Sequence, residues 1–186
     1  AAWALVNRPQ RGLLALAALV PFDGLLLLVP HPGLVEGWKE GLVLVTFGAS
    51  LLSPHSVPWR QIRLPGWAAP AALLLLLALV SAVLVPTTQG IQGLKIGYFY
   101  LLVPLIVVRN PFTARDRDRL VTILMVIGVT TALYGVAQQV LGGSRLEAMG
   151  YSYDDTIMTA GGLLRSFSTF NQPFGFGLFI MMVLLV

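Results

Sequence analysis

The sequence contains no cysteine, and only 11% of its 186 residues are charged. Because cysteine is absent, residue usage gives no indication of the redox compartment. Soluble domains carry about a quarter charged residues, so the low charge excludes an ordinary soluble domain. The chain also lacks a glycine-rich phosphate loop, the ligand spacing of a zinc site and a nucleophile elbow.

Hydrophobic residues make up 56% of the chain, and the mean hydropathy is +0.81. These values predict an integral membrane protein. A backbone in lipid must satisfy its own hydrogen bonds, so the apolar runs are predicted to be helices and the fold class all-α. The 12 basic residues are scattered between apolar blocks and form no binding stripe, so we expect no nucleic-acid partner. No residue pattern indicates a metal or another cofactor.

Six apolar segments predict a polytopic bundle of about six membrane-spanning helices, in a single domain over residues 1–186. The segments are residues 12–29, 38–52, 67–85, 91–108, 120–141 and 173–186. Pro21 and Gly24 predict a break in the first segment, where Asp23 either caps a half-helix or is a functional intramembrane acid. The last segment is shorter than the roughly 20 residues of a span, so we expect a fragment of a longer protein.

Basic residues in the connectors predict how the bundle is oriented. Taken on alternate connectors, one side carries eight of them: Arg8, Arg11, Arg60, Arg63, Arg109, Arg115, Arg117 and Arg119. The other side carries four: Lys39, Lys95, Arg145 and Arg165. Since lysine and arginine are retained on the cytoplasmic side, the N-terminus is predicted to be cytoplasmic and the loop 142–164 external.

Two cations are then predicted to approach the outer leaflet from different helices. Lys95 lies one to two turns inside the outer end of its span, and Arg165 directly precedes the last span. Arginine at a helix end is often a snorkelling anchor. Two cations near one face favour instead a shared anionic partner, so we expect Lys95 and Arg165 to hold a phosphate or pyrophosphate.

Amide side chains stand close to the same predicted surface. Gln138 ends the fifth segment, where an amide either joins helices or contacts a substrate. Gly135, one turn earlier, would let a helix or a ligand approach closely. Asn171 and Gln172 either orient a hydroxylated substrate or cap the last helix, which Pro173 would begin.

These residues resemble motifs of the O-antigen ligase and polymerase superfamily of bacterial envelope proteins. Members carry a Tyr-Gly-x-x-Gln element that ends one span, matched by "YGVAQ" at residues 134–138. An Arg-x-x-Ser/Gly-Thr-Phe stretch with an amide-proline pair follows, matched by "RSFSTFNQP" at residues 165–173. The basic residue of "GLKIGYFYLLVP" is also similar. Many members have asparagine after the proline, whereas this chain has Phe174.

The resemblance implies a glycosyltransferase of lipopolysaccharide biosynthesis or a related pathway, acting at the outer face of the bacterial inner membrane. Such proteins move a glycan from an undecaprenyl-pyrophosphate carrier to a lipid or glycan acceptor, and have about twelve spans. Arg165 would be the catalytic residue. Lys95, Gln138, Asn171 and Gln172 would bind substrate. The partners implied are the lipid-linked donor, the acceptor and membrane lipids.

Two other functions stay open. Small-residue faces such as "GASLLS" and "TAGGLL" permit close helix packing, as in a non-catalytic accessory subunit beside other membrane subunits. The two cations also suit a transporter of a small anion. Transport ranks lower, because the inner halves of the fourth and fifth segments are apolar.

Overall fold

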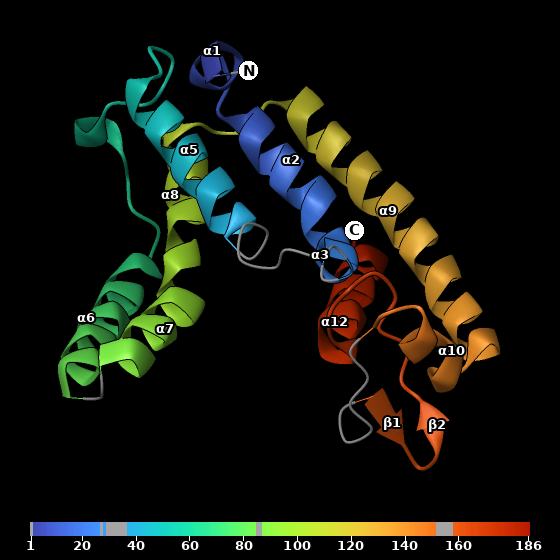
Figure 1. Cartoon of the computed structure of the whole chain (residues 1–186). Coiled ribbons are helices and arrows are strands. Elements are labelled where there is room, and N and C mark those ends of the chain that lie inside the picture. Colours follow the sequence, from blue (N-terminus) through green and yellow to red (C-terminus); the bar gives the residue numbers. More distant parts are fainter. Residues whose placement is uncertain (1, 27, 29–36, 85–86, 152–157) are drawn as a thin grey trace. The chain divides into compact units, whose positions relative to one another are not determined.

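The computed structural model describes residues 2–26, 28, 37–84, 87–151 and 158–186. The fold is all-α over these residues, apart from one short antiparallel hairpin (Figure 1). The hairpin pairs β1 (Thr159–Ala160) with β2 (Leu163–Leu164).

The predicted number of about six spans is wrong. Among the described residues, two helical runs are long and apolar enough to cross a membrane, Thr88–Arg109 and Ala114–Leu141. Helix α5 (Trp38–Leu52) has 15 residues and rises only about 22 Å, less than the roughly 30 Å of a hydrocarbon core. Two other apolar helices, α6 (Ala68–Leu84) and α12 (Pro173–Leu184), are also short. An apolar run in the sequence therefore does not by itself establish a membrane span; α5 has the bounds of its predicted segment and is still too short.

The chain divides into two compact units. Unit 1 comprises residues 1–13 and 40–112, and unit 2 comprises residues 14–39 and 113–186. Helices α2 (Gln10–Leu19) and α5 each contribute residues to both units.

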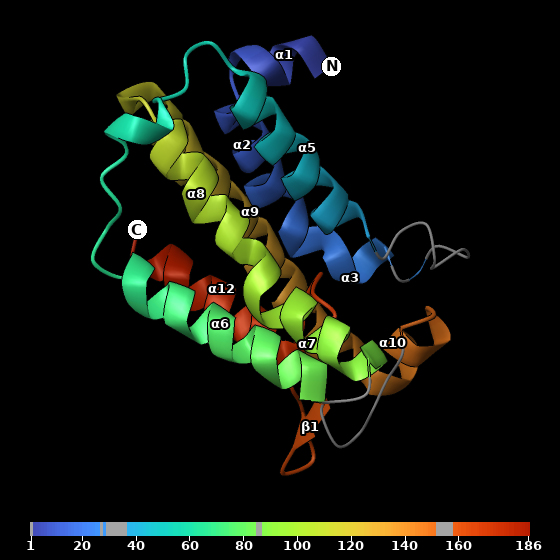
Figure 2. The same cartoon turned by 90° about the vertical axis from the view of Figure 1, so that its left-hand side faces the viewer.

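Unit 1 is built from α5 and a set of helices that follow it. These are η2 (Trp59–Gln61), α6, α7 (Thr87–Tyr98), η3 (Phe99–Leu101) and α8 (Leu102–Arg109), with α1 (Ala2–Asn7) at the start of the chain. Helices α6 and α7 run side by side (Figure 2). One face of α5 is buried through Val43, Thr46, Ala49 and Ser50, a helical spacing typical of a packed face.

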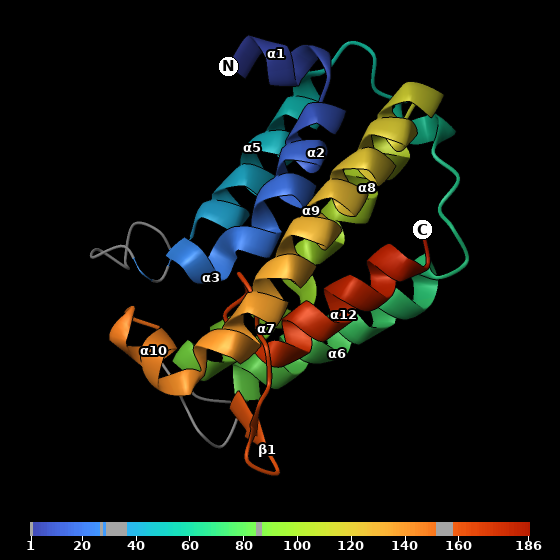
Figure 3. The ribbon, with the colours of Figure 1, turned by 90° about the vertical axis from the view of Figure 1, so that its right-hand side faces the viewer.

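Unit 2 is built around the long helix α9 (Ala114–Leu141). It also contains η1 (Val20–Phe22), α3 (Asp23–Leu26), α10 (Gly143–Ala148), the hairpin and α12 (Figure 3). Its hydrophobic core consists of Leu146, Tyr151, Met158 and Phe167. A capping box between Thr113 and Asp116 starts α9 six residues before the predicted span.

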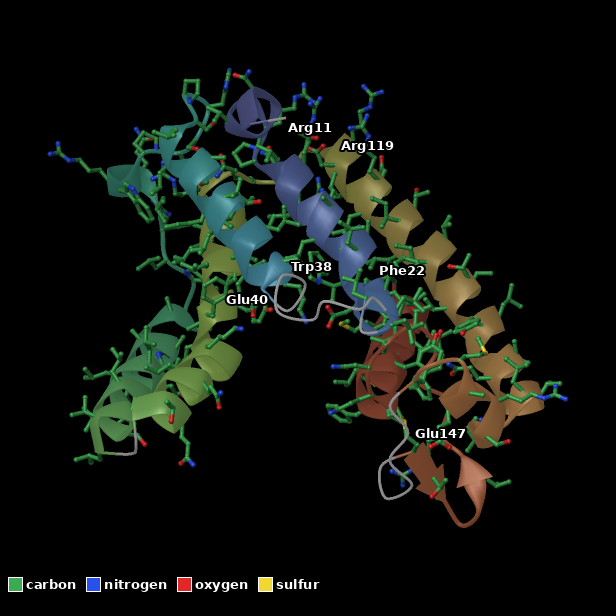
Figure 4. The ribbon with its side chains drawn as sticks, in the orientation of Figure 1. Arg11, Phe22, Trp38, Glu40, Arg119 and Glu147 are labelled. Carbon is green, nitrogen blue, oxygen red and sulfur yellow. The ribbon has the colours of Figure 1, made fainter. Side chains whose placement is uncertain are left out.

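The predicted break in the first apolar segment is confirmed. Pro21 lies in η1 and Asp23 begins α3. The Asp23 carboxylate accepts hydrogen bonds from Lys39 Nζ at 2.7 Å and from Trp38 Nε1 at 2.9 Å, both at the start of α5 (Figure 4). Asp23 therefore has an ion-pair partner that the sequence did not indicate.

Candidate functional site

The two motifs singled out in the sequence meet within unit 2, and Gln138 joins them. Its side chain is fully buried near the end of α9. The Oε1 atom accepts hydrogen bonds from the backbone N–H groups of Ser168 at 2.7 Å and Phe167 at 3.2 Å. The Nε2 atom donates to the carbonyl oxygen of Ser168 at 2.9 Å. The amide thus holds the loop 165–172 through its backbone.

Ser168 is held in an unusual conformation at this contact. Its φ of 53° lies in the left-handed region, which is uncommon for a residue other than glycine. Its Oγ atom donates to the carbonyl oxygen of Thr131 at 2.6 Å. Thr131 lies about two turns before Gln138 in α9. Side-chain and backbone bonds to α9 together compensate the strain, so the loop has one defined shape.

A second set of contacts lies on the adjacent, more exposed side of α9. The Gln139 amide donates to Ser166 Oγ and to the carbonyl oxygen of Leu164, both at 2.7 Å. Ser166 Oγ donates to the carbonyl oxygen of Gly135 at 2.7 Å. A Cβ atom at Gly135 would lie 2.9 Å from Phe176 Cζ of α12. Gly135 therefore admits a helix, one of the two neighbours that the sequence predicted.

Backbone groups at the break between η1 and α3 form hydrogen bonds with the end of the loop 165–172. The N–H of Gly24 donates to the carbonyl oxygen of Thr169 at 2.9 Å, and Thr169 Oγ1 donates to the carbonyl oxygen of Pro21. A Cβ atom at Gly24 would overlap the backbone of Phe170. Backbone groups exposed by the break thus find partners in the loop.

Two tyrosines link α9 to the core. The hydroxyl groups of Tyr134 and Tyr151 are 2.9 Å apart, and the Tyr151 ring packs edge-on against Phe167 at 5.3 Å between centroids. Burial, and to a lesser extent the contact with Tyr134, raises the pKa of Tyr151 above its ordinary value. Tyr151 is therefore neutral at physiological pH.

The remaining predicted residues of this unit face outward. Arg165, Asn171 and Gln172 are exposed. The Arg165 backbone N–H donates to the carbonyl oxygen of Met158 at 2.6 Å, while its guanidinium makes no ion pair with a described carboxylate. Gln172 is the N-cap residue of α12 but its side chain makes no capping hydrogen bond, and Pro173 begins the helix as predicted.

A small cavity lies beneath the same loop. It has a volume of about 70 Å³, and its wall includes Gly24, Tyr151, Met158, Phe170 and Asn171. Its size suits a few atoms rather than a sugar ring or a lipid chain. A larger substrate would have to lie on the exposed side of the loop.

Lys95 belongs to unit 1, where it has a carboxylate partner. Its Nζ atom is 3.0 Å from Glu40 Oε1, with the Glu40 side chain only 15% exposed and that of Lys95 49% exposed. Glu40 is not among the residues predicted from the sequence, although an acid at the start of an apolar segment is the signal that could have found it. The phosphate that Lys95 and Arg165 are predicted to share stays a prediction, since the two residues belong to separate units.

Within the part of the chain that the structure describes, no group of three or more histidine, aspartate or glutamate side chains could hold a metal ion. No family model, curated protein or solved structure matches this chain. The geometry around Gln138 is therefore read from this molecule alone.

Proposed function

We propose that the chain is part of a bacterial envelope glycan ligase or polymerase. It would transfer a glycan from an undecaprenyl-pyrophosphate carrier at the outer face of the inner membrane, with the N-terminus cytoplasmic. The observation that carries the proposal is the meeting of the two motifs, 134–138 and 165–173, through Gln138. Both motifs belong to the resemblance, and they form one ordered structure at the end of an apolar helix long enough to cross a membrane.

Arg165 is assigned the role of binding the donor pyrophosphate. Its guanidinium is exposed, while the loop that carries it is held by buried bonds. A planar guanidinium pairs well with phosphate oxygens. Negative charge grows on the pyrophosphate as the bond to the sugar breaks, so a fixed cation there lowers the barrier.

The amides near Arg165 are assigned different roles. Asn171 and Gln172 are exposed on the same loop and are available to a sugar hydroxyl. Gln138 is buried and bonded to the loop backbone, so its contribution would be to position Arg165. Lys95 would contribute to phosphate binding only by sharing its charge between Glu40 and the donor.

The test is glycan transfer by cells whose own copy carries Arg165→Ala or Arg165→Lys. Transfer is expected to fall by at least about a hundredfold in the alanine variant, as for loss of a group that stabilises developing charge. Lysine should restore part of it. Arg145→Ala is the matched control, because Arg145 is also an exposed arginine of unit 2. Membrane abundance of each variant is measured in parallel.

Unchanged transfer with Arg165→Ala would remove Arg165 from the active site. If transfer were lost only when the whole chain is deleted, the accessory-subunit function would replace this proposal.

A further inference from the structure

Arg109, at the end of α8 in unit 1, is buried although most of its guanidinium nitrogens have no hydrogen-bond partner among the described residues. Its side chain is 5% exposed. One nitrogen, Nη2, donates to the carbonyl oxygen of Ser50 at 3.1 Å, and the guanidinium carbon lies 4.5 Å from the Trp59 ring centroid. The Nε and Nη1 atoms are buried and have no hydrogen-bond partner among the described residues.

Unit 1 is poor in carboxylates. Its sequence contains six basic residues, Arg8, Arg11, Arg60, Arg63, Lys95 and Arg109, and one acid, Glu40. The Glu40 carboxylate pairs with Lys95. A buried cation without an anion is strongly disfavoured, and no described carboxylate forms an ion pair with Arg109.

A second buried donor without a described partner lies just after the end of α5. Ser53 Oγ is buried and has no hydrogen-bond partner among the described residues. Ser53 follows the end of α5, one turn after Ser50, whose carbonyl oxygen Arg109 contacts. The Ser56 N–H donates to the carbonyl oxygen of Ser53 at 3.3 Å, and the Val57 N–H donates to that of Arg109 at 2.8 Å, so the turn that carries Ser53 lies against the end of α8.

The neighbouring polar groups are fully used, unlike these two. Ser56 Oγ is 2.7 Å from both the carbonyl oxygen of Ser50 and Asn110 Oδ1. Asn110 Nδ2 donates to Ser50 Oγ at 2.5 Å and to the carbonyl oxygen of Ile106 at 3.2 Å. Unused donors therefore occur specifically at Arg109 and Ser53, rather than throughout the cluster.

We propose that Arg109 and Ser53 bind one phosphate group. Phosphate offers several acceptor oxygens and a charge that matches guanidinium. Arg109 ends an apolar helical run long enough to cross a membrane, and a residue at the end of a span would lie at the depth of lipid headgroups. Trp59, half exposed over the guanidinium, is typical of that interface. Exposed Arg60 and Arg63 on and beside η2 would attract the anion.

The same chemistry could come from an anionic phospholipid or from free phosphate, and the experiment separates them. The full chain is purified in a neutral, phosphate-free detergent at fixed ionic strength. Binding of inorganic phosphate and of short-chain phosphatidylglycerol is measured by calorimetry, together with the shift each causes in Tm. Saturation at one phosphate group per chain is expected for at least one of the two probes.

The variants are chosen to fold. Ser53→Ala removes a hydroxyl with no described partner, so the free protein should keep its Tm while binding weakens by about tenfold. Arg109→Gln should weaken binding more. Ser56→Ala is the matched control: it should lower the Tm of the free protein but leave binding within about twofold, because its hydroxyl is already engaged.

Binding of phosphatidylglycerol alone would assign the site to a lipid headgroup, and binding of inorganic phosphate would assign it to a free oxyanion. Binding of neither probe would overturn the proposal, as would binding that Ser53→Ala and Arg109→Gln leave unchanged. None of these outcomes depends on Arg165 or on glycan transfer.

Discussion

Each unit buries a polar cluster where a helix meets a loop, and the two clusters differ in how completely they are bonded. Around Gln138 in unit 2, every amide atom is engaged and the side chain carries no charge. Around Arg109 in unit 1, a charged side chain keeps two nitrogens without a described partner. A neutral cluster whose polar atoms are all hydrogen-bonded suits a structural role. An unpaired buried charge and donors without partners favour the binding of a ligand.

The two units also differ in their balance of basic and acidic residues. Unit 1 has six basic residues and one acid, so unit 2 holds the other six of the 12 basic residues and seven of the eight acids. Charges in unit 2 can therefore be balanced within the unit, as Asp23 is by Lys39. Those of unit 1 cannot all be balanced within the unit, and the buried cation there has no described carboxylate partner.

The largest expected effect comes from breaking the saturated cluster. Gln138→Leu should lower the free energy of unfolding by about 3 kcal/mol, because it leaves the backbone groups of Phe167 and Ser168 buried without partners. Unfolding in mixed detergent, followed by tryptophan fluorescence, measures the loss. Gln139→Leu is the control; its amide is exposed, so the loss should stay below about 1 kcal/mol. Equal losses would contradict a scaffold role specific to Gln138.

Asn110 and Arg109 are adjacent in unit 1, and substituting each in turn compares a fully bonded residue with a partly bonded one in the same cluster. Asn110→Ala should cost about 2 kcal/mol, because Ser50, Ser56 and Ile106 lose bonded partners. Arg109→Met in phosphate-free detergent should cost less than about 1 kcal/mol, since removing an unbalanced buried charge offsets the lost contacts. Unfolding titrations of both variants measure the two losses in the free energy of unfolding. A larger loss for Arg109→Met would mean that Arg109 is a structural residue.

Two glycines should respond with opposite signs. Gly135→Ala should destabilise by about 1 kcal/mol, because the contact with Phe176 outweighs the gain in helix propensity. Gly177→Ala in α12, where nothing lies within 4 Å of the new Cβ atom, should stabilise by up to about 1 kcal/mol. Combining Gly135→Ala with Phe176→Leu should restore stability in a double-mutant cycle. Additive losses in that cycle would exclude the packing explanation.

The smallest expected effect is a pH dependence of unit 2. The pKa of Tyr151 is raised in the folded protein above the ordinary value of 10.0, so the folded state holds the proton more tightly. Its stabilisation is complete below pH 10.0 and declines as the pH rises above that value. The loss should be under about 1 kcal/mol half a pH unit above 10.0. Tyr151→Phe should show no such decline relative to wild type when unfolding is measured against pH.

The helical class and several local features could be predicted from the sequence. Pro21 breaks the first apolar segment and Pro173 begins α12, because proline restricts the backbone wherever it occurs. The number of spans could not be predicted from apolar runs. Hydropathy registers composition, whereas a span also needs an uninterrupted helix of sufficient length, and α5 ends after 15 residues.

Residue types and the resemblance singled out Gln138 and the stretch 165–173, but not that the Gln138 amide bonds the loop backbone 30 residues away. Glu40 and Ser53 were missed for the same reason. Ser53 has no distinctive neighbour in sequence, and Glu40 is marked only as an acid at the start of an apolar segment; what distinguishes them is a partner found, or not found, in space.

By itself, the sequence determined the apolar, helical character of the chain, its breaks at proline, and the excess of basic residues in residues 40–112. These follow from composition and backbone restriction, which act locally. Only the tertiary structure decided which polar groups are satisfied. Hydrogen bonds and ion pairs depend on distances of a few ångströms between residues far apart in the chain, so Gln138 and Arg109 became distinguishable only once folded.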